Sequence, residues 1–299
     1  MGATAKTLGR ITALVESGVV PAGGNICDIG ETQLFGSDIV PASLQFLSFF
    51  ADRTAKAKAP DSLTTSDAAK LGDGKLLGDL LVLAGFQYTA LDIFPGHRTT
   101  LFDLNVHEPG PALVEGFDLV LNLGTTEHVF NQLRAFQTLH SLQKIGAVCY
   151  HDLPLAGYPL HALYRYDPLF FEIVSEANKY DLVLRAITTG PAYPMPHKLK
   201  DIGFNISHLT DVGIECVLRR TSSEEFKIPM EMGTSTTVSD ALEHFVPNTS
   251  ASFPQGTTIN YGAALYNVSL RTLTKVWINK VLRVAKDRIA VLRPTATQL

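Results

Sequence analysis

Acidic residues end three short apolar runs in this sequence. Asp28, Asp92 and Asp103 each follow several apolar residues of the kind that form buried strands. A carboxylate has two acceptor oxygens and no donor, so each could accept hydrogen bonds from the hydroxyl or amino groups of a ligand. Aspartate is also common in turns and at helix starts, where it accepts hydrogen bonds from backbone amides. Three acids at successive strand ends favour a shared ligand over three separate turn roles.

Two histidines accompany the next two apolar runs. His128 follows residues 117–123, and His151 comes directly after 146–150. Imidazole titrates near neutral pH, so either histidine could remove a proton from a substrate hydroxyl. The alternatives are a packing or helix-start role for His128 and a structural role for His151. Asp152 would orient His151 or ligate a metal ion, but we expect no metal site because no second carboxylate is close in the sequence.

The spacing of apolar residues predicts alternating strands and helices. After a first amphipathic helix, helical periodicity covers 75–86, 131–144 and 169–179. Short apolar runs predict strands at residues 25–30, 88–93, 99–104, 117–123, 146–150, 182–187 and 214–219. We therefore expect a doubly wound, mostly parallel α/β domain with a seven-stranded Rossmann-like sheet and helices on both faces. Ligands of such domains bind at the carboxyl ends of the strands, where the three acids would gather.

Two segments do not fit this alternation. Residues 31–74 contain more chain than a strand-to-helix turn needs, so we expect an inserted lid or a surface loop there. Residues 221–258 are rich in Ser, Thr, Pro and Gly, which is typical of irregular chain. We expect one domain over 1–220 and an extension over 221–299 that contains an irregular linker and a C-terminal helix.

From about residue 25 to residue 220, the sequence resembles the class I S-adenosylmethionine-dependent methyltransferase family. The resemblance rests on CDIG at 27–30, on the acids that end the next two runs, and on FDLVLNLGTTEHV at 117–129. It implies the Rossmann-like fold of that family and S-adenosylmethionine as the cofactor. The sequence departs from the family pattern after Gly30, where Glu-Thr-Gln replaces further glycines.

The resemblance also implies roles for single residues. Asp28 would bind the methionine portion of the cofactor, and Gly30 would let the backbone approach it. Asp92 would accept hydrogen bonds from both ribose hydroxyls, and Asp103 would accept one from the adenine amino group. The implied cofactor-binding residues are Asp28, Gly30, Asp92, Ile93, Asp103, Leu104, Asn122, Gly124, Thr125 and Glu127.

The implied activity is methyl transfer to a small-molecule acceptor, and a histidine base favours a hydroxyl as the acceptor group. Tyr158, Tyr164 and Arg165 lie in an aromatic segment that either binds the acceptor, with Arg165 on an acidic group, or packs onto the sheet. A scaffold protein that keeps the fold without turnover is the alternative that the altered glycine loop favours. A nicotinamide-dependent reductase is a third hypothesis, which the absence of G-x-G-x-x-G after the first strand weakens.

The composition limits the partners and the location. A formal charge of −4 disfavours nucleic acid, because phosphate binding needs a dense basic surface. Cys27, Cys149 and Cys216 lie in apolar surroundings, and no secretion signal or membrane-spanning run is evident, so we expect free thiols in a cytoplasmic protein. Residues 270–293 predict a basic amphipathic helix. It either contacts an anionic surface or packs on the domain or on another subunit of a homo-oligomer.

Overall fold

The computed structural model describes residues 2–158, 160–188, 192–194 and 212–230, and at 192–194 the backbone alone. The predicted basic helix at 270–293 lies outside these residues. Among the described residues, none of the helices is long and apolar enough to cross a membrane.

The centre of the described chain is a sheet of eight strands in the order β3-β2-β1-β4-β5-β8-β6-β7. The strands β1 to β5 pair in parallel, whereas β8 is antiparallel to both of its neighbours, β5 and β6. The strands are β1 (Asn25–Ile29), β2 (Gln87–Asp92), β3 (Thr99–Leu101), β4 (Phe117–Leu123), β5 (Gln143–Ala156), β6 (Asp181–Thr188), β7 (Ala192–Pro194) and β8 (Val212–Arg219). The predicted doubly wound, mostly parallel sheet is confirmed.

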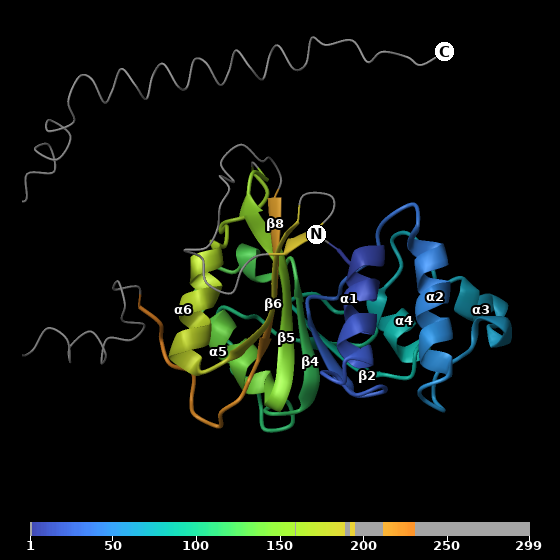
Figure 1. Cartoon of the computed structure of the whole chain (residues 1–299), viewed down its shortest axis with the longest axis horizontal. Helices are drawn as coiled ribbons and strands as arrows, with labels where there is room; N and C mark the ends of the chain where they lie inside the picture. The colour runs from blue at the N-terminus through green and yellow to red at the C-terminus, as the bar shows by residue number, and fades with distance from the viewer. Residues whose placement is uncertain (1, 159, 189–191, 195–211, 231–299) are drawn as a thin grey trace, which may run out of the picture. The chain divides into compact units, whose positions relative to one another are not determined.

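Helices cover both faces of this sheet. Figure 1 shows α5 and α6 on one side, and α1, α2 and α4 on the other. The helices are α1 (Ala5–Glu16), α2 (Ile39–Ala51), α3 (Thr65–Ala68), α4 (Leu77–Leu83), α5 (Gln132–Leu142) and α6 (Pro168–Asn178), with the short 3₁₀ helices η1 (Pro60–Ser62) and η2 (Thr126–His128).

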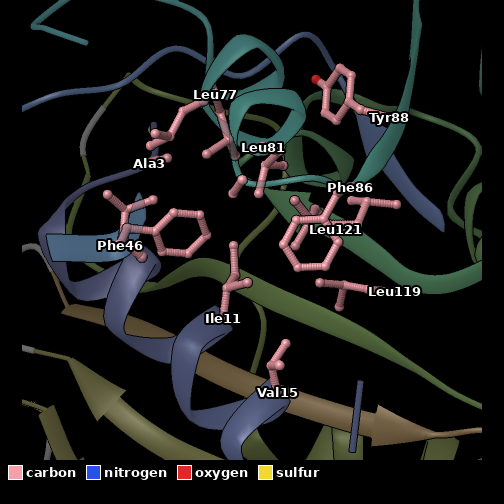
Figure 2. Close-up of a cluster of buried hydrophobic side chains, with 14 of the residues drawn as sticks. Ala3, Ile11, Val15, Phe46, Leu77, Leu81, Phe86, Tyr88, Leu119 and Leu121 are labelled. Atoms are coloured by element: carbon pink, nitrogen blue, oxygen red, sulfur yellow. The ribbon is translucent and has the colours of Figure 1, made fainter. Parts of the chain in front are cut away.

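The hydrophobic core is divided by the sheet into two clusters, because successive strand residues point to opposite faces. On β4, Leu119 and Leu121 belong to the cluster under α1, α2 and α4, while Val120 belongs to the cluster under α5 and α6. Figure 2 shows part of the first cluster, in which Ile11 of α1 and Phe46 of α2 approach the strands. Strands buried on both faces explain the almost unbroken apolar runs of the sequence.

All seven predicted strands are present, but β3 ends at Leu101 instead of residue 104, and β5 is much longer than predicted. The strand β5 begins at Gln143, inside the predicted helix 131–144, and runs to Ala156 instead of ending at residue 150. It is this long because β8 pairs with it from Val148 to Ala156. The short strand β7 at the sheet edge was not predicted.

Residues 31–74, for which we expected an inserted lid or a surface loop, contain the helices α2, η1 and α3. In α2, Ile39, Phe46, Leu47 and Phe50 are buried in the first core cluster. These four residues recur at helical spacing, so the sequence did contain the signal. The segment therefore forms part of the layer that covers the sheet.

The division into 1–220 and 221–299 stays a prediction. The described residues 221–230 lie against α6, since the backbone amide of Lys227 donates to Asn178 Oδ1 over 2.7 Å. The side chain of Asn178 in turn donates to the carbonyl of Lys227 over 3.1 Å.

Candidate active site

Two adjoining cavities open at the carboxyl ends of β1, β2 and β4. Their volumes are about 280 Å³ and about 260 Å³, and both are lined by Gly30, Asp92, Gly124 and Thr125. We name the first the ring cavity and the second the loop cavity. The ring cavity is also lined by Leu91, Ile93, Phe94, Phe102, Asp103, Leu104, Asn105, His128 and Val129, and the loop cavity by Glu31, Thr32, Gln33, Phe35 and Leu123.

A larger cavity of about 420 Å³ lies elsewhere and contains none of the predicted site residues. Its wall carries charges of both signs that already pair with one another. Arg134 pairs with Glu108, and Arg220 pairs with Glu115 over 3.1 Å. Paired charges leave little to recognise a ligand, so the cavities at the strand ends are the candidate site.

Gly30 and Thr125 hold the two strand-end loops together. Gly30 has φ +92°, and its amide donates to the carbonyl of Leu91 over 2.8 Å. The hydroxyl of Thr125 donates to the carbonyl of Ile29, and a Cβ atom on Gly30 would lie 2.7 Å from that hydroxyl oxygen. Only glycine fits both this backbone angle and this close approach.

Gly30→Ala is expected to lower the free energy of unfolding by at least about 2 kcal/mol, because backbone strain of about 1–3 kcal/mol adds to an overpacking cost of similar size. The matched control is Gly146→Ala, since Gly146 has φ +86° but no atom within 4 Å of the added methyl group. Urea unfolding measures both. Equal losses in the two variants would show that the contact with Thr125 costs nothing.

Asp92 and Asp103 lie where the sequence predicted them. The carboxylate of Asp92 accepts from the amides of Glu31 (2.9 Å) and Phe94 (3.0 Å), and each oxygen has capacity for a further bond. Oδ1 of Asp103 accepts from the backbone and side chain of Asn105, and these two bonds lower the pKa of Asp103. Among the described residues, Oδ2 of Asp103 has no partner.

Apolar side chains surround these two acids in the ring cavity. Ile93 is 60% exposed and Phe94 is 70% exposed, although both are large and hydrophobic. Leu104 is buried in the wall. An apolar slot with few polar groups is typical of a site that binds a planar ring.

Asp28 and Asn122 were predicted to touch the cofactor, but neither lines a cavity. The buried carboxylate of Asp28 accepts from the amide and hydroxyl of Thr32 and, over 2.8 Å, from the hydroxyl of Tyr88. Burial raises the pKa of Asp28 to about 7 despite these bonds. The side chain of Asn122 bonds to Thr126 at two points. Both residues thus stabilise the loops after β1 and β4 through hydrogen bonds to Thr32 and Thr126, without contacting either cavity.

His151, predicted as a catalytic base, is buried and has no access to either cavity. Its side chain lies between the rings of Phe136 and Phe171. Burial lowers the pKa of His151 to about 3, so it is a weak base at neutral pH. Asp152 does not orient it, because neighbouring strand residues point to opposite faces. The Asp152 carboxylate pairs with Lys6 over 2.9 Å on the other side of the sheet.

His128 remains at the ring cavity and has two neighbours that can ligate or exchange protons. Its side chain is 46% exposed, and its Nε2 atom lies 3.9 Å from Oε1 of Glu127. The ring of His161 lies 5.1 Å away. Burial and then the charge of His161 lower the pKa of His128, so its imidazole is neutral at pH 7. Glu127, predicted to bind the cofactor, lines neither cavity and points into this cluster.

The predicted acceptor-binding residues Tyr158, Tyr164 and Arg165 also line neither cavity. The guanidinium of Arg165 donates to backbone carbonyls of its own loop, including those of Gly157 and Ala162 (3.1 Å each). The guanidinium of Arg165 therefore stabilises the loop and does not face a site for an acidic substrate group. The hydroxyl of Tyr164 donates to the carbonyl of Phe130 over 2.9 Å, which fixes this loop beside the ring cavity.

No protein-family model matches the sequence, and no curated protein does. Among solved structures, 1,6-didemethyltoxoflavin-N1-methyltransferase from Burkholderia thailandensis is 10% identical with a TM-score of 0.39, over 72% of this chain and 78% of that chain. Geranyl diphosphate methyltransferase is 9% identical with a TM-score of 0.38, over 72% and 85%. The [4+2]-cyclase SpnF is 12% identical with a TM-score of 0.38, over 71% and 80%. Identities of 9–12% and TM-scores of 0.38–0.39 carry no conclusion about the activity of this chain.

Proposed function

We propose that this protein transfers a methyl group from S-adenosylmethionine to a small-molecule acceptor, and that the acceptor group is a hydroxyl. The observation that carries the proposal is the pair of adjoining cavities at the strand ends, with the carboxylate of Asp92 in their common wall. A nucleoside in one cavity and an amino-acid chain in the other would meet at that carboxylate.

The residues present fit the cofactor. In the ring cavity, Asp92 would accept hydrogen bonds from the ribose hydroxyls, and Oδ2 of Asp103 would accept one from the adenine amino group. Ile93 and Leu104 would pack on the two faces of the adenine ring. The methionine portion would occupy the loop cavity, where Gly30 has no side chain to exclude it.

The acidic walls also suit the charge of the cofactor. Glu31 and Asp92 both line the loop cavity, so a positively charged sulfur and amino group would meet negative side chains there. Bound at this site, S-adenosylmethionine would supply a methyl group to a lone pair of the acceptor oxygen, and the bonding pair would stay on the sulfur.

His128 is the residue that would take the hydroxyl proton. It lines the ring cavity, and its neutral imidazole has a free lone pair at neutral pH. The exposed side chains of Phe130, which follows the cavity residue Val129, and Leu163, whose amide bonds to Glu127, would offer apolar contacts to the acceptor. Such contacts would displace water from the acceptor.

Calorimetric titration of the protein with S-adenosylmethionine and S-adenosylhomocysteine tests the proposal. We expect micromolar dissociation constants for both and no binding of NADH, which serves as the control ligand. Binding of NADH instead would favour the reductase hypothesis. A folded protein that binds none of the three would favour a scaffold protein.

The scaffold protein remains the second candidate because of the loop after β1. Asp28, which precedes this loop in β1, accepts three hydrogen bonds from Thr32 and Tyr88 and lines neither cavity. We also propose a cytoplasmic location, which the three buried free cysteines Cys27, Cys149 and Cys216 support.

A further inference from the structure

Three side chains that can ligate a metal ion meet beside the ring cavity. Glu127 and His128 lie in η2, directly after β4, and His161 lies in the loop that follows β5. One ligating atom of each lies within 4.8 Å of the other two. The loop is tied to η2, because the amides of Leu163 and Tyr164 donate to the carbonyl of Glu127 over 3.0 and 3.1 Å.

The carboxylate of Glu127 is buried, and its ionisable neighbour is His128, whose Nε2 lies 3.9 Å from Oε1. Its side chain is 0% exposed, and neither Oε1 nor Oε2 accepts a hydrogen bond from any residue that the structure describes. Within the same residues, Nε2 of His161 is also buried without a hydrogen bond. A buried carboxylate without a hydrogen bond costs several kcal/mol. Together with the two imidazoles, it forms a set of three side chains that can ligate one cation.

We propose that Glu127, His128 and His161 bind one divalent first-row transition-metal ion. Two imidazoles and one carboxylate are the ligand set of zinc and iron(II) sites that keep open coordination positions. In tetrahedral geometry, bonds of about 2.0–2.2 Å place ligand atoms about 3.4 Å apart. The most widely separated pair, which lies within 4.8 Å, would therefore close in by about 1 Å on binding.

The position of the ion gives it a role in catalysis, and this second step rests on the proposed function. Because His128 also lines the ring cavity, an open coordination position would face the acceptor. A hydroxyl bound there loses its proton to solvent more easily, since the ion stabilises the oxygen anion. With the ion bound, His128 would be a ligand, so removal of the hydroxyl proton would depend on the ion and not on His128 as a base.

Cobalt(II) titration of the EDTA-treated full chain tests the site, because the visible absorption of cobalt(II) reports its ligands. We expect one Co²⁺ per chain and a higher Tm with the ion bound. His161→Gln, His128→Asn and Glu127→Gln should each weaken binding at least tenfold. His97→Gln is the matched control, since His97 is exposed and outside the cluster, and it should bind as the wild type does.

Circular dichroism establishes that each variant is folded, and His161→Gln alone suffices should Glu127→Gln fail to fold. Wild-type affinity in folded His161→Gln, or no Co²⁺ binding by the wild type, would overturn the site. A parallel titration with S-adenosylhomocysteine separates the two proposals. If the protein binds S-adenosylhomocysteine but not Co²⁺, only the metal-site proposal is contradicted. If it binds Co²⁺ but not S-adenosylhomocysteine, the metal site is supported and the methyltransferase proposal is contradicted.

Discussion

Asp92→Ala is expected to weaken the binding of S-adenosylhomocysteine at least a hundredfold. Two hydrogen bonds from ribose hydroxyls to a charged carboxylate are worth about 3 kcal/mol together, which corresponds to a factor of about 100. The variant also removes the acceptor for the amides of Glu31 and Phe94, so the loops that line both cavities lose their common anchor. Calorimetric titration measures the dissociation constant.

Two control variants make this result specific to Asp92. Asp92→Asn keeps the shape but replaces one acceptor with a donor, so its affinity should lie between those of the wild type and Asp92→Ala. Asp61→Ala removes an exposed acid of η1 that lines neither cavity, so it should leave the affinity unchanged. Unchanged affinity in Asp92→Ala would mean that the cofactor does not contact the end of β2.

Asp28→Asn is expected to remove a strong pH dependence from the stability of the fold. The pKa of Asp28 is raised from 3.8 to about 7 by burial, so the folded protein holds a proton that the unfolded chain has lost above about pH 4. The unfolded state thus binds fewer protons, and stability falls as the pH rises towards 7. The wild type should lose roughly 3 kcal/mol between pH 5 and pH 8 through this group.

Urea unfolding at several pH values, for the wild type and for Asp28→Asn, isolates this contribution as the difference between the two curves. Asparagine suits the site, because its oxygen can accept from Tyr88 while its amide donates to the hydroxyl of Thr32. Other titrating groups contribute equally to both proteins. Parallel curves would show that Asp28 is ionised throughout this range.

The sequence predicted strand ends well where a strand is short and buried on both faces. The strand β2 ends at Asp92 itself, so this acid lies in the cavity wall as expected. The strand β5 was harder, because its length depends on its pairing with β8, which lies far along the chain. His151 is therefore in the middle of a strand, and its burial could not be inferred from local apolar spacing.

The site beyond the strand ends depended on tertiary contacts. His161 meets Glu127 only because the loop after β5 folds back and bonds to η2. No spacing rule relates these two residues, so the sequence did not predict that their side chains meet. In the case of α2, by contrast, the helical spacing of Phe46, Leu47 and Phe50 was readable, but the long separation between β1 and β2 favoured a loop.

The position of β8 has a consequence for how the protein is made. It is the last strand along the described chain, yet it lies between β5 and β6, and its Glu215 accepts from Arg10 of α1 over 3.1 Å. Until the ribosome has released residue 219, β5 and β6 each expose an unpaired edge that can pair with another nascent chain. The strands β1 to β4 can form their parallel half-sheet before that point, since each is adjacent to another of the four. The half of the sheet that lines the two cavities can thus form before the half that depends on β8, which is the stage most exposed to aggregation.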